Sequence, residues 1–296
     1  MERVEGKTGF ITGGASGIGL GIAKAFVAAG MNAVLADVRQ DHLDEAAAWF
    51  AAAGAGDRVL ALRLDVTDRA AYAQAADAAE ARFGKVHVLV NNAGMGILGP
   101  LKQIRYDDWD WGLGVMIGGV VNGIQTFLPR ILAHGEGGHI VNTSSMAAVV
   151  PIPNCAIYIT AKSAVMGMAE CLRAELAPDN IGVSAFCPGP VQSNIRESGR
   201  TRPEQFRKDS GLAEFESRLE ERPNSPLWMT NEECGERVLA GIRRNNLFIF
   251  THPEFRDGSK ERFDAMLDAY PDEPINRERE AAIGFLLHNP IYKRAD

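Results

Sequence analysis

Cysteine is scarce in this sequence, with four residues in a chain of 296. The cysteines do not form a Cys-x-x-Cys pair, and no histidine stands beside them at the spacing of metal ligands. Disulfide frameworks and zinc modules depend on such patterns. We therefore expect no metal site and no disulfide framework. Reduced, mostly buried thiols are the interpretation of Cys155, Cys171, Cys187 and Cys234.

The sequence also lacks a surplus of positive charge and an apolar run of membrane length. Its formal net charge is −7 at pH 7, which supplies no basic field for the phosphates of a nucleic acid. We find no run of the roughly 18 uncharged apolar residues that a membrane span needs. The charged start, Met1 to Lys7, leads directly into an apolar strand without a cleavable apolar region. These features predict a cytoplasmic protein without a nucleic-acid or membrane partner.

Hydrophobic residues make up 46% of the chain, enough to bury a sizeable core in one main domain. Short apolar runs recur along it, and a helix-forming segment follows each of them except the last. The predicted strands are Thr8–Thr12, Ala33–Ala36, Val59–Leu64, Val86–Val90, His139–Asn142, Gly182–Phe186 and Leu247–Phe250. This alternation predicts an α/β fold, a Rossmann-type doubly wound parallel sheet of about seven strands with helices on both faces. The chemistry should lie on loops directly after the strands.

Two segments depart from this alternation. Residues 195–229 are charged and contain prolines, and a connection of this length is usually either a lid over a site or partly disordered. We interpret it as a substrate lid. Residues 1–250 would then form the dinucleotide-binding catalytic domain, including the lid. Residues 251–296 form a charged C-terminal extension whose prolines predict short helices joined by turns, packed on the same domain.

A glycine-rich turn, Thr12-Gly13-Gly14-Ala15-Ser16-Gly17-Ile18-Gly19, follows the first predicted strand and leads into the helical run Leu20–Ala29. Glycine lets the backbone approach a pyrophosphate closely, and the helix N-terminus supplies free N–H groups and the positive end of the helix dipole. Such a turn could serve strand–helix packing alone, but its position after a strand and before a helix favours a dinucleotide site. The predicted cofactor contacts here are Gly13, Ser16, Gly17, Ile18 and Gly19.

The residue that ends the second predicted strand bears on the choice between NAD and NADP. Asp37 lies 18 residues beyond Gly19, where a carboxylate can accept hydrogen bonds from the adenosine ribose hydroxyls and would repel a 2′-phosphate. A helix-entry or turn carboxylate is the alternative role for Asp37. Arg39 weakens the inference because its guanidinium could pair with that phosphate. The sequence therefore favours NAD as cofactor over NADP.

Tyr158 and Lys162 stand four residues apart in an apolar run that predicts a buried helix, so their side chains should share one face. A phenol is a poor base at neutral pH, and a nearby ammonium should lower its pKa toward the working range. Ser145 lies 13 residues before Tyr158, just beyond a predicted strand, where its hydroxyl could hydrogen-bond a substrate oxygen as charge develops. A Tyr-x-x-x-Lys pair by itself is often only a helix face. With Ser145 and the glycine turn it predicts a catalytic site.

Three more signatures follow strands in order: Asp65-Val66, Asn91-Asn92-Ala93-Gly94 and Pro188-Gly189-Pro190-Val191. Together with the Thr-Gly-x-x-x-Gly-x-Gly turn and Ser145, Tyr158 and Lys162, they cover most of the chain, which resembles the short-chain dehydrogenase/reductase family. The lid and the segment Thr251–Arg256 resemble the bacterial branch of that family that contains lignin-type Cα-dehydrogenases, which oxidise benzylic secondary alcohols of aryl ethers with NAD.

The resemblance implies further roles for individual residues. Asp65 and Val66 would hold the adenine ring, and Asn91 the adenosine side of the cofactor. Val191 and Ser193 would hold the nicotinamide carboxamide, although the family commonly has threonine at the position of Ser193. Tyr158 and Lys162 would contact the cofactor as well as catalyse, with Lys162 on the nicotinamide ribose. A homodimer or homotetramer is also implied.

One family residue is missing. The family has an asparagine in the helix after Asn91-Asn92-Ala93-Gly94, where it maintains a helix distortion whose carbonyl holds a water linked to the lysine, and the alignment places Met116 there. Asn122 is six residues further on, about 240° round a regular helix, so it cannot take over from the same face. The glycines around Met116 could preserve the distortion by backbone flexibility.

Two functions therefore compete. The first is hydride transfer between NAD and a hydrophobic, aromatic secondary alcohol or ketone, with Tyr158 as acid and base. An apolar substrate fits the soft side chains expected near the nicotinamide, which are Met95, Met146, Ile152, Pro153 and Pro190, although each of them could equally belong to the core. The second is a catalytically weakened nicotinamide-binding or sensing protein on the same fold, for which Met116 is the argument.

Overall fold

A seven-stranded, all-parallel sheet forms the centre of the computed structural model, which describes residues 1–220 and 223–292. The strand order is β3-β2-β1-β4-β5-β6-β7. The strands are β1 (Thr8–Thr12), β2 (Asn32–Asp37), β3 (Val59–Arg63), β4 (Val88–Asn91), β5 (Gly138–Thr143), β6 (Ile181–Cys187) and β7 (Phe248–Phe250). The predicted doubly wound α/β fold is confirmed, with strand bounds within about two residues of those expected.

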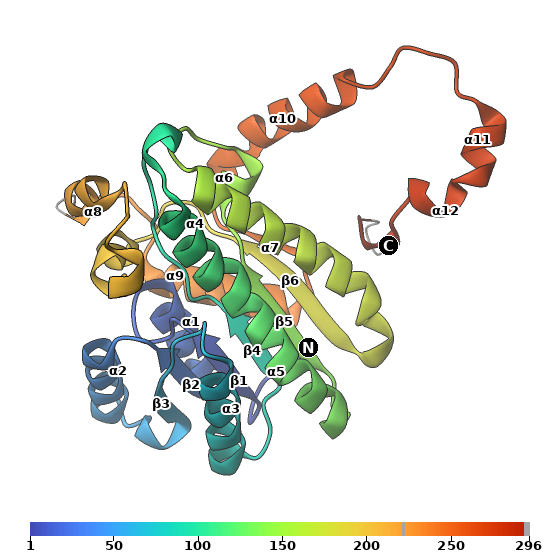
Figure 1. Ribbon diagram of the computed structural model, residues 1–296. Helices are drawn as coiled ribbons and strands as arrows, with labels where there is room; N and C mark the ends of the chain where they lie inside the picture. Colours follow the sequence, from blue (N-terminus) through green and yellow to red (C-terminus); the bar gives the residue numbers. More distant parts are fainter. Residues whose placement is uncertain (221–222, 293–296) are drawn as a thin grey trace.

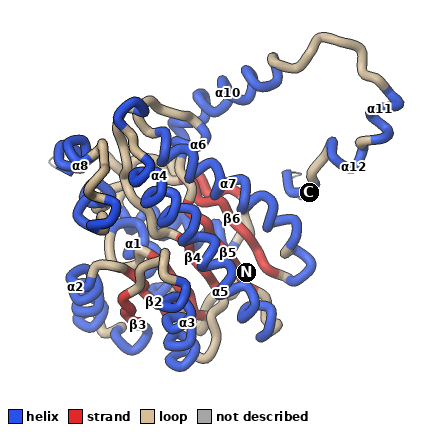
Figure 2. Tube along the Cα trace, viewed as in Figure 1, coloured by secondary structure: helices blue, strands red, loops and turns tan. Residues whose placement is uncertain are grey.

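Helices cover both faces of this sheet (Figures 1 and 2). The α-helices are α1 (Gly17–Ala28), α2 (Gln40–Ala52), α3 (Arg69–Phe83), α4 (Tyr106–Leu113), α5 (Gly119–His134), α6 (Met146–Val149), α7 (Ala156–Glu175), α8 (Ala213–Glu220), α9 (Asn231–Arg243), α10 (Arg256–Asp268), α11 (Arg277–Ala282) and α12 (Gly284–Leu287). A π-helical turn, η3 (Gly114–Gly118), joins α4 to α5. Short 3₁₀ turns are η1 (Gly56–Arg58), η2 (Leu101–Gln103), η4 (Ala177–Asp179), η5 (Ile195–Thr201), η6 (Glu204–Phe206), η7 (Pro253–Phe255) and η8 (Pro290–Tyr292).

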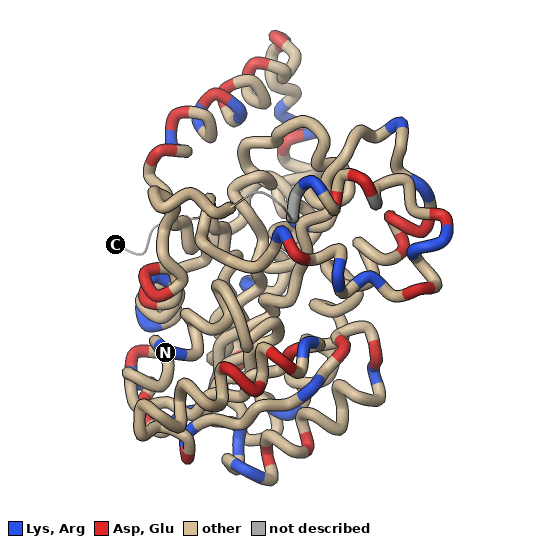
Figure 3. The backbone as a smooth tube through the Cα atoms, turned by 90° about the vertical axis from the view of Figure 1, so that its left-hand side faces the viewer, with Lys and Arg blue, Asp and Glu red and all other residues tan. Residues whose placement is uncertain are grey.

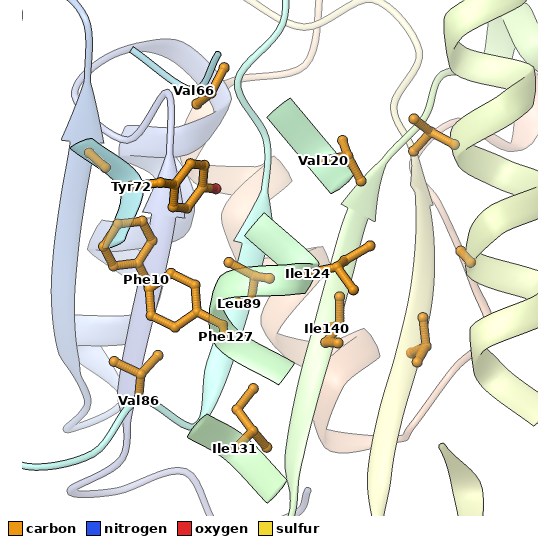
Figure 4. Packing of buried hydrophobic residues seen from close by; sticks show 14 of the residues in the cluster. Phe10, Val66, Tyr72, Val86, Leu89, Val120, Ile124, Phe127, Ile131 and Ile140 are labelled. Atoms are coloured by element: carbon orange, nitrogen blue, oxygen red, sulfur yellow. The ribbon is translucent and has the colours of Figure 1, made fainter. Parts of the chain in front are cut away.

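The core consists of one apolar layer on each face of the sheet. Side chains alternate along a strand, so in β1 Phe10 packs with α3 and α5, whereas its neighbour Ile11 packs with α1, α2 and α9. Figure 4 shows the first layer, in which Phe10 lies against Phe127 with ring centroids 4.5 Å apart. Because helices cover both faces of the sheet, its strands are largely apolar along their whole length. This is the pattern expected of a parallel sheet.

The helical run Tyr106–His134, which comprises α4, η3 and α5, is by length and composition apolar enough to cross a membrane. It packs instead as a core element. Val120, Ile124, Phe127 and Ile131 from this run are buried against the sheet, and 44% of its most apolar window is buried. The core helix of a globular protein can be equally long and apolar, so this helix is only weak evidence for a membrane span.

The two predicted accessory segments differ in how they meet the sheet domain. The 195–229 segment, of which residues 221 and 222 lie outside the described part, carries η5, η6 and α8 beside α4. Beyond β7 the chain continues as η7, α10, α11, α12 and η8, a series of short helices that extends away from the body (Figure 1). Arg262 donates to the carbonyls of Ala148 and Val149, and Tyr292 donates to Glu170. Between these contacts most side chains of the extension are exposed.

Helices α1 and α9 approach each other backbone to backbone, at Gly21 and Gly235. A Cβ added at Gly21 would collide with the backbone of Asn231, and one added at Gly235 would collide with the carbonyl of Gly21. Since α1 starts at the glycine turn, this contact fixes the direction of the predicted pyrophosphate-binding helix. The short distance is available only to glycine.

We therefore expect Gly21→Ala to lower the free energy of unfolding by about 1–3 kcal/mol, because the methyl group must push α9 away. Urea denaturation monitored by circular dichroism measures this change. Gly258→Ala in α10 is the matched control, since its Cβ would meet Val150 at an ordinary 3.5 Å and alanine is the better helix former. Equal stability of Gly21→Ala and wild type would contradict the close approach.

Candidate active site

A cleft of about 580 Å³ lies beyond the carboxyl ends of the strands, within the size range of small-molecule sites. Loops after β1, β2, β3, β4, β5 and β6 contribute to its walls, as the fold predicts. Among the residues predicted from the sequence, those that line it are Gly13, Ser16, Gly17, Ile18, Asp37, Asp65, Val66, Tyr158, Lys162 and Ser193. The parallel topology thus brings together side chains that lie as much as 180 residues apart in sequence.

The glycine turn has the geometry of a cradle for a phosphate group. Gly13 and Gly17 have φ angles of +60° and +48°, which side-chain-bearing residues rarely adopt. A Cβ at Gly13 would come 3.0 Å from the Cα of Ala93, and one at Gly17 would come 2.9 Å from the Cβ of Ser193. The glycine turn therefore packs tightly against the loops after β4 and β6. The first turn of α1 carries no acidic residue, so its N–H groups and dipole suit the pyrophosphate of a dinucleotide.

Asp37 lines the cleft at the end of β2 and is a buried residue, with 8% of its surface exposed. One oxygen accepts from the N–H of Ala15 at 3.3 Å and the other from the N–H of Arg39 at 3.1 Å. Asp37 thus acts as a turn carboxylate and also faces the cleft, so both roles considered for it are present. At the end of β3, Asp65 accepts from the N–H and the hydroxyl of Thr67 and lines the cleft with Val66.

Three predicted contacts are placed elsewhere. Asn91 is the last residue of β4, and its side chain donates to Asn142 across the sheet at 2.9 Å. Val191 is buried and forms a bridge with Met229. Gly19 lies against the Gly13 carbonyl, where only hydrogen fits, so it allows close packing of the turn.

Asn92 takes the position at the cleft that the sequence analysis assigned to Asn91. Its Nδ2 donates to the carbonyls of Thr12 and Gly13 at 3.0 and 3.2 Å, so it stabilises the glycine turn. Thr12 was also missed, although its hydroxyl accepts from the N–H groups of Asn92 and Ala93, both at 3.0 Å. The different positions of Asn91 and Asn92 could have been predicted from the alternation of side chains along a strand, because Asn91 is the last residue of β4 and Asn92 follows it.

Tyr158, Lys162 and Ser145 are brought together by the β5–α7 junction. The Lys162 Nζ donates to the Thr143 carbonyl at 2.8 Å and lies 5.7 Å from the centroid of the Tyr158 ring. The Tyr158 hydroxyl shares a hydrogen bond with the side chain of Ser145. Ser144 points the other way and donates to the Lys162 carbonyl at 2.7 Å, so the two adjacent serines have separate roles.

The pKa of Tyr158 differs from the expectation drawn from the sequence. Burial raises it, and the hydrogen bond with Ser145 opposes that increase only in part. Burial also lowers the pKa of Lys162 to about 8. Because a buried site disfavours every charged form, burial here outweighs the lowering of the phenol pKa that was expected from the nearby lysine. The site can therefore donate a proton from the Tyr158 phenol. The neighbouring Lys162 amino group has a pKa of about 8.

The helix distortion expected near Met116 is present without the family asparagine. Gly114–Gly118 form a π-helical turn between α4 and α5, and Gly114 and Val115 line the cleft. The Met116 side chain is fully buried and packs with Ile157 and Ala161 of α7. Asn122 is engaged elsewhere, since its Nδ2 donates to the Val66 carbonyl at 2.9 Å.

At the other end of the cleft, Trp111 of α4 and Phe206 of η6 supply aromatic walls. Arg202 is buried beside Trp111, with its guanidinium 4.2 Å from the ring centroid, and it forms ion pairs with Asp108 at 2.9 Å and with Glu216. Of the five apolar residues expected near the nicotinamide, Met95 lines the cleft, Met146 is buried in the core and Ile152 is exposed.

Other parts of the chain offer fewer groups for chemistry. Within residues 1–220 and 223–292, no group of three or more His, Cys, Asp and Glu side chains is arranged to hold a metal ion. All four cysteines are free, with Cys155, Cys187 and Cys234 buried and Cys171 exposed. Acidic and basic residues alternate over the face seen in Figure 3.

Known proteins share both the sequence and the fold. The short chain dehydrogenase family model matches residues 7–204. The C alpha-dehydrogenase of Sphingobium sp. strain SYK-6 is 37% identical over 95% of this chain and 92% of its own length. A short chain dehydrogenase/reductase from Burkholderia phymatum in complex with NAD is 34% identical, with a TM-score of 0.83 over 93% of this chain and 100% of that one. For the apo form of LigO from Sphingobium sp. strain SYK-6, the identity is 40% and the TM-score 0.78, over 97% and 98% of the two chains. The chain therefore belongs to the short chain dehydrogenase family of oxidoreductases that use a nicotinamide cofactor.

Proposed function

We propose that this protein transfers a hydride between NAD and a hydrophobic, aromatic secondary alcohol or ketone, with Tyr158 as the acid and base. The observation that carries the proposal is the placement of the Tyr158 hydroxyl, bonded to Ser145 and next to Lys162, in the same cleft as the glycine cradle. When bound, the cofactor supplies or accepts the hydride. The residues of the chain would handle the proton.

In the direction of reduction, Tyr158 donates its phenolic proton to the carbonyl oxygen of the substrate as negative charge develops there. The Ser145 hydroxyl stabilises the same oxygen and fixes its distance from the phenol. Lys162 lies behind the ring, where its ammonium stabilises the phenolate that the transfer leaves. In oxidation the same groups act in reverse order.

The walls of the cleft support an apolar, aromatic substrate. Trp111 and Phe206 offer ring surfaces, Met95 adds a polarizable side chain, and the nearby guanidinium of Arg202 already has carboxylate partners in Asp108 and Glu216. A substrate carboxylate would therefore find no ready partner in Arg202. The resemblance to a C alpha-dehydrogenase agrees with this choice, and the 195–229 segment would serve as the lid.

The cofactor choice rests on the carboxylate of Asp37, which faces the cleft at the end of β2. A 2′-phosphate would meet this buried negative charge at close range. The guanidinium of Arg39 could have neutralised that phosphate, but it forms ion pairs with Asp41 and Glu197. Both features favour NAD over NADP.

A cytoplasmic homodimer or homotetramer remains part of the proposal. The C-terminal extension supports self-association, because it exposes large apolar side chains such as Leu267 and Phe285, which are 66% and 81% exposed. The competing interpretation, a weakened cofactor-binding or sensing protein, rested on the missing asparagine. The π-helical turn at Met116 supports the enzyme interpretation, because the helix distortion is present without that asparagine.

Replacement of the proton donor tests the proposed chemistry. Tyr158→Phe should lower turnover of aryl secondary alcohols at least a hundredfold, while cofactor affinity changes far less, because the ring stays and only the transferable proton is lost. The measurements are absorbance of the reduced nicotinamide for turnover and its fluorescence for binding. Tyr106→Phe, at a phenol that is 88% exposed, should behave as wild type. Wild-type rates in Tyr158→Phe would remove this residue from the mechanism.

The lowered pKa of Lys162 predicts a pH dependence. A lysine with a depressed pKa is charged below that value, so the ammonium is lost as pH rises through about 8. The rate of ketone reduction should therefore fall above this pH when kcat is measured from about pH 6 to about pH 10. In Lys162→Arg the guanidinium stays charged over this range, so whatever rate remains should lack that decline. An unchanged decline would assign the ionisation to another group.

Asp37→Ala should reduce the preference for NAD over NADP more than Arg39→Ala does. The reason is that loss of the Asp37 carboxylate removes its repulsion of a 2′-phosphate. We expect the ratio of kcat/KM for the two cofactors to change by roughly tenfold or more in Asp37→Ala. A wild-type enzyme that favours NADP would contradict the assignment of the cofactor.

A further inference from the structure

Glu197 places a second carboxylate at the adenosine end of the cleft, and it comes from the lid. It lies in η5, 158 residues after Arg39, and its Oε2 accepts from the Arg39 Nη1 at 3.0 Å. Both side chains line the cleft together with Asp37. Arg200 also pairs with this carboxylate, at 3.1 Å. The ion pair thus joins the loop after β2 to the lid.

The position of Glu197 is fixed by the backbone of η5. Its own N–H donates to the Asn194 carbonyl at 2.9 Å. The next residue, Ser198, is 91% buried, and its hydroxyl accepts from the N–H of Gly96 at 2.9 Å and donates to the Ile195 carbonyl at 2.5 Å. These bonds attach η5 to the loop after β4, so Glu197 is held at the cleft and does not depend on Arg39 alone for its placement.

The guanidinium of Arg39 is engaged along both of its edges. Asp41 accepts from the Nε at 3.0 Å and also from the Nη2, which occupies the edge nearest the side chain. Glu197 takes the Nη1 on the outer edge. A phosphate is bound most strongly by two neighbouring N–H groups on one edge. With these two carboxylates in place, Arg39 offers a 2′-phosphate neither edge.

We propose that Glu197 is a cofactor-selecting residue, which disfavours a 2′-phosphorylated adenosine by holding the outer edge of the Arg39 guanidinium. The inference rests on the proposed use of NAD and assigns a part of that choice to the lid. Asp37 repels the phosphate directly, whereas Glu197 withholds the cation that would otherwise neutralise it.

The test measures binding without turnover. Calorimetry on the full chain gives dissociation constants for ADP-ribose and for its 2′-phosphorylated counterpart. Glu197→Gln keeps the size of the side chain and removes its charge, and we expect it to shift the ratio of the two constants roughly tenfold toward the phosphorylated ligand. In the Arg39→Gln background the same substitution should shift the ratio less than about twofold, because there is no guanidinium to release.

Glu204→Gln provides the control, since this lid carboxylate is paired with Arg207 at 3.7 Å and its side chain is 90% exposed. It should leave the ratio unchanged. A Glu197→Gln ratio equal to that of wild type would overturn the inference, and so would an equal shift in both backgrounds or in the control. Failure of the proposed NAD preference would look different, because wild type itself would then bind the 2′-phosphorylated ligand more tightly.

Discussion

The hydrogen bond from the Lys162 amino group to the Thr143 carbonyl joins the sheet to the helix that carries the reacting groups. A second bond, from the Ser144 hydroxyl to the Lys162 carbonyl, runs between the same two elements in the opposite direction. The end of β5 and the second turn of α7 are thus fixed to each other at two points. Burial of the amino group is costly, and the pKa of about 8 reflects that cost. The Lys162 ammonium therefore loses its proton near pH 8. A purely structural contact would not require such a lowered pKa.

The 195–229 segment is attached to the rest of the domain by ion pairs of different character. Beside Trp111, Arg202 is almost fully buried with Asp108 and Glu216, and loss of one partner would leave an uncompensated charge in the interior. Arg39 and Glu197 are partly exposed, so their ion pair is weaker and more sensitive to salt. The two attachments of residues 195–229 therefore differ in strength, and the weaker one is the Arg39–Glu197 pair.

The sequence predicted the sheet, the glycine cradle and the Tyr158–Lys162 pair because each depends on local spacing. Strands buried on both faces are apolar throughout, and residues four apart on a helix share a face whatever the rest of the chain does. Asn91 lies within the sheet and Asn92 at the cleft, because one residue decides whether a side chain lies within the sheet or at its edge. Glu197 was not found because its partner is 158 residues away. The direction of the Tyr158 pKa shift could not be predicted either, since burial outweighs the effect of the nearby lysine.

Met116 shows that a π-helical turn can form here without an asparagine at its centre. A π-helical turn contains an extra residue, which costs hydrogen-bond geometry and needs compensation from packing. Here Gly114 and Gly118 bound the turn, and the methionine fills a buried space against Ile157 and Ala161 of α7. Apolar burial of a methionine side chain contributes about 1.5–3 kcal/mol, comparable to the net contribution of a few hydrogen bonds. Packing against α7 can thus stabilise the turn without an asparagine, and the backbone carbonyls of the turn do not depend on the type of residue at position 116.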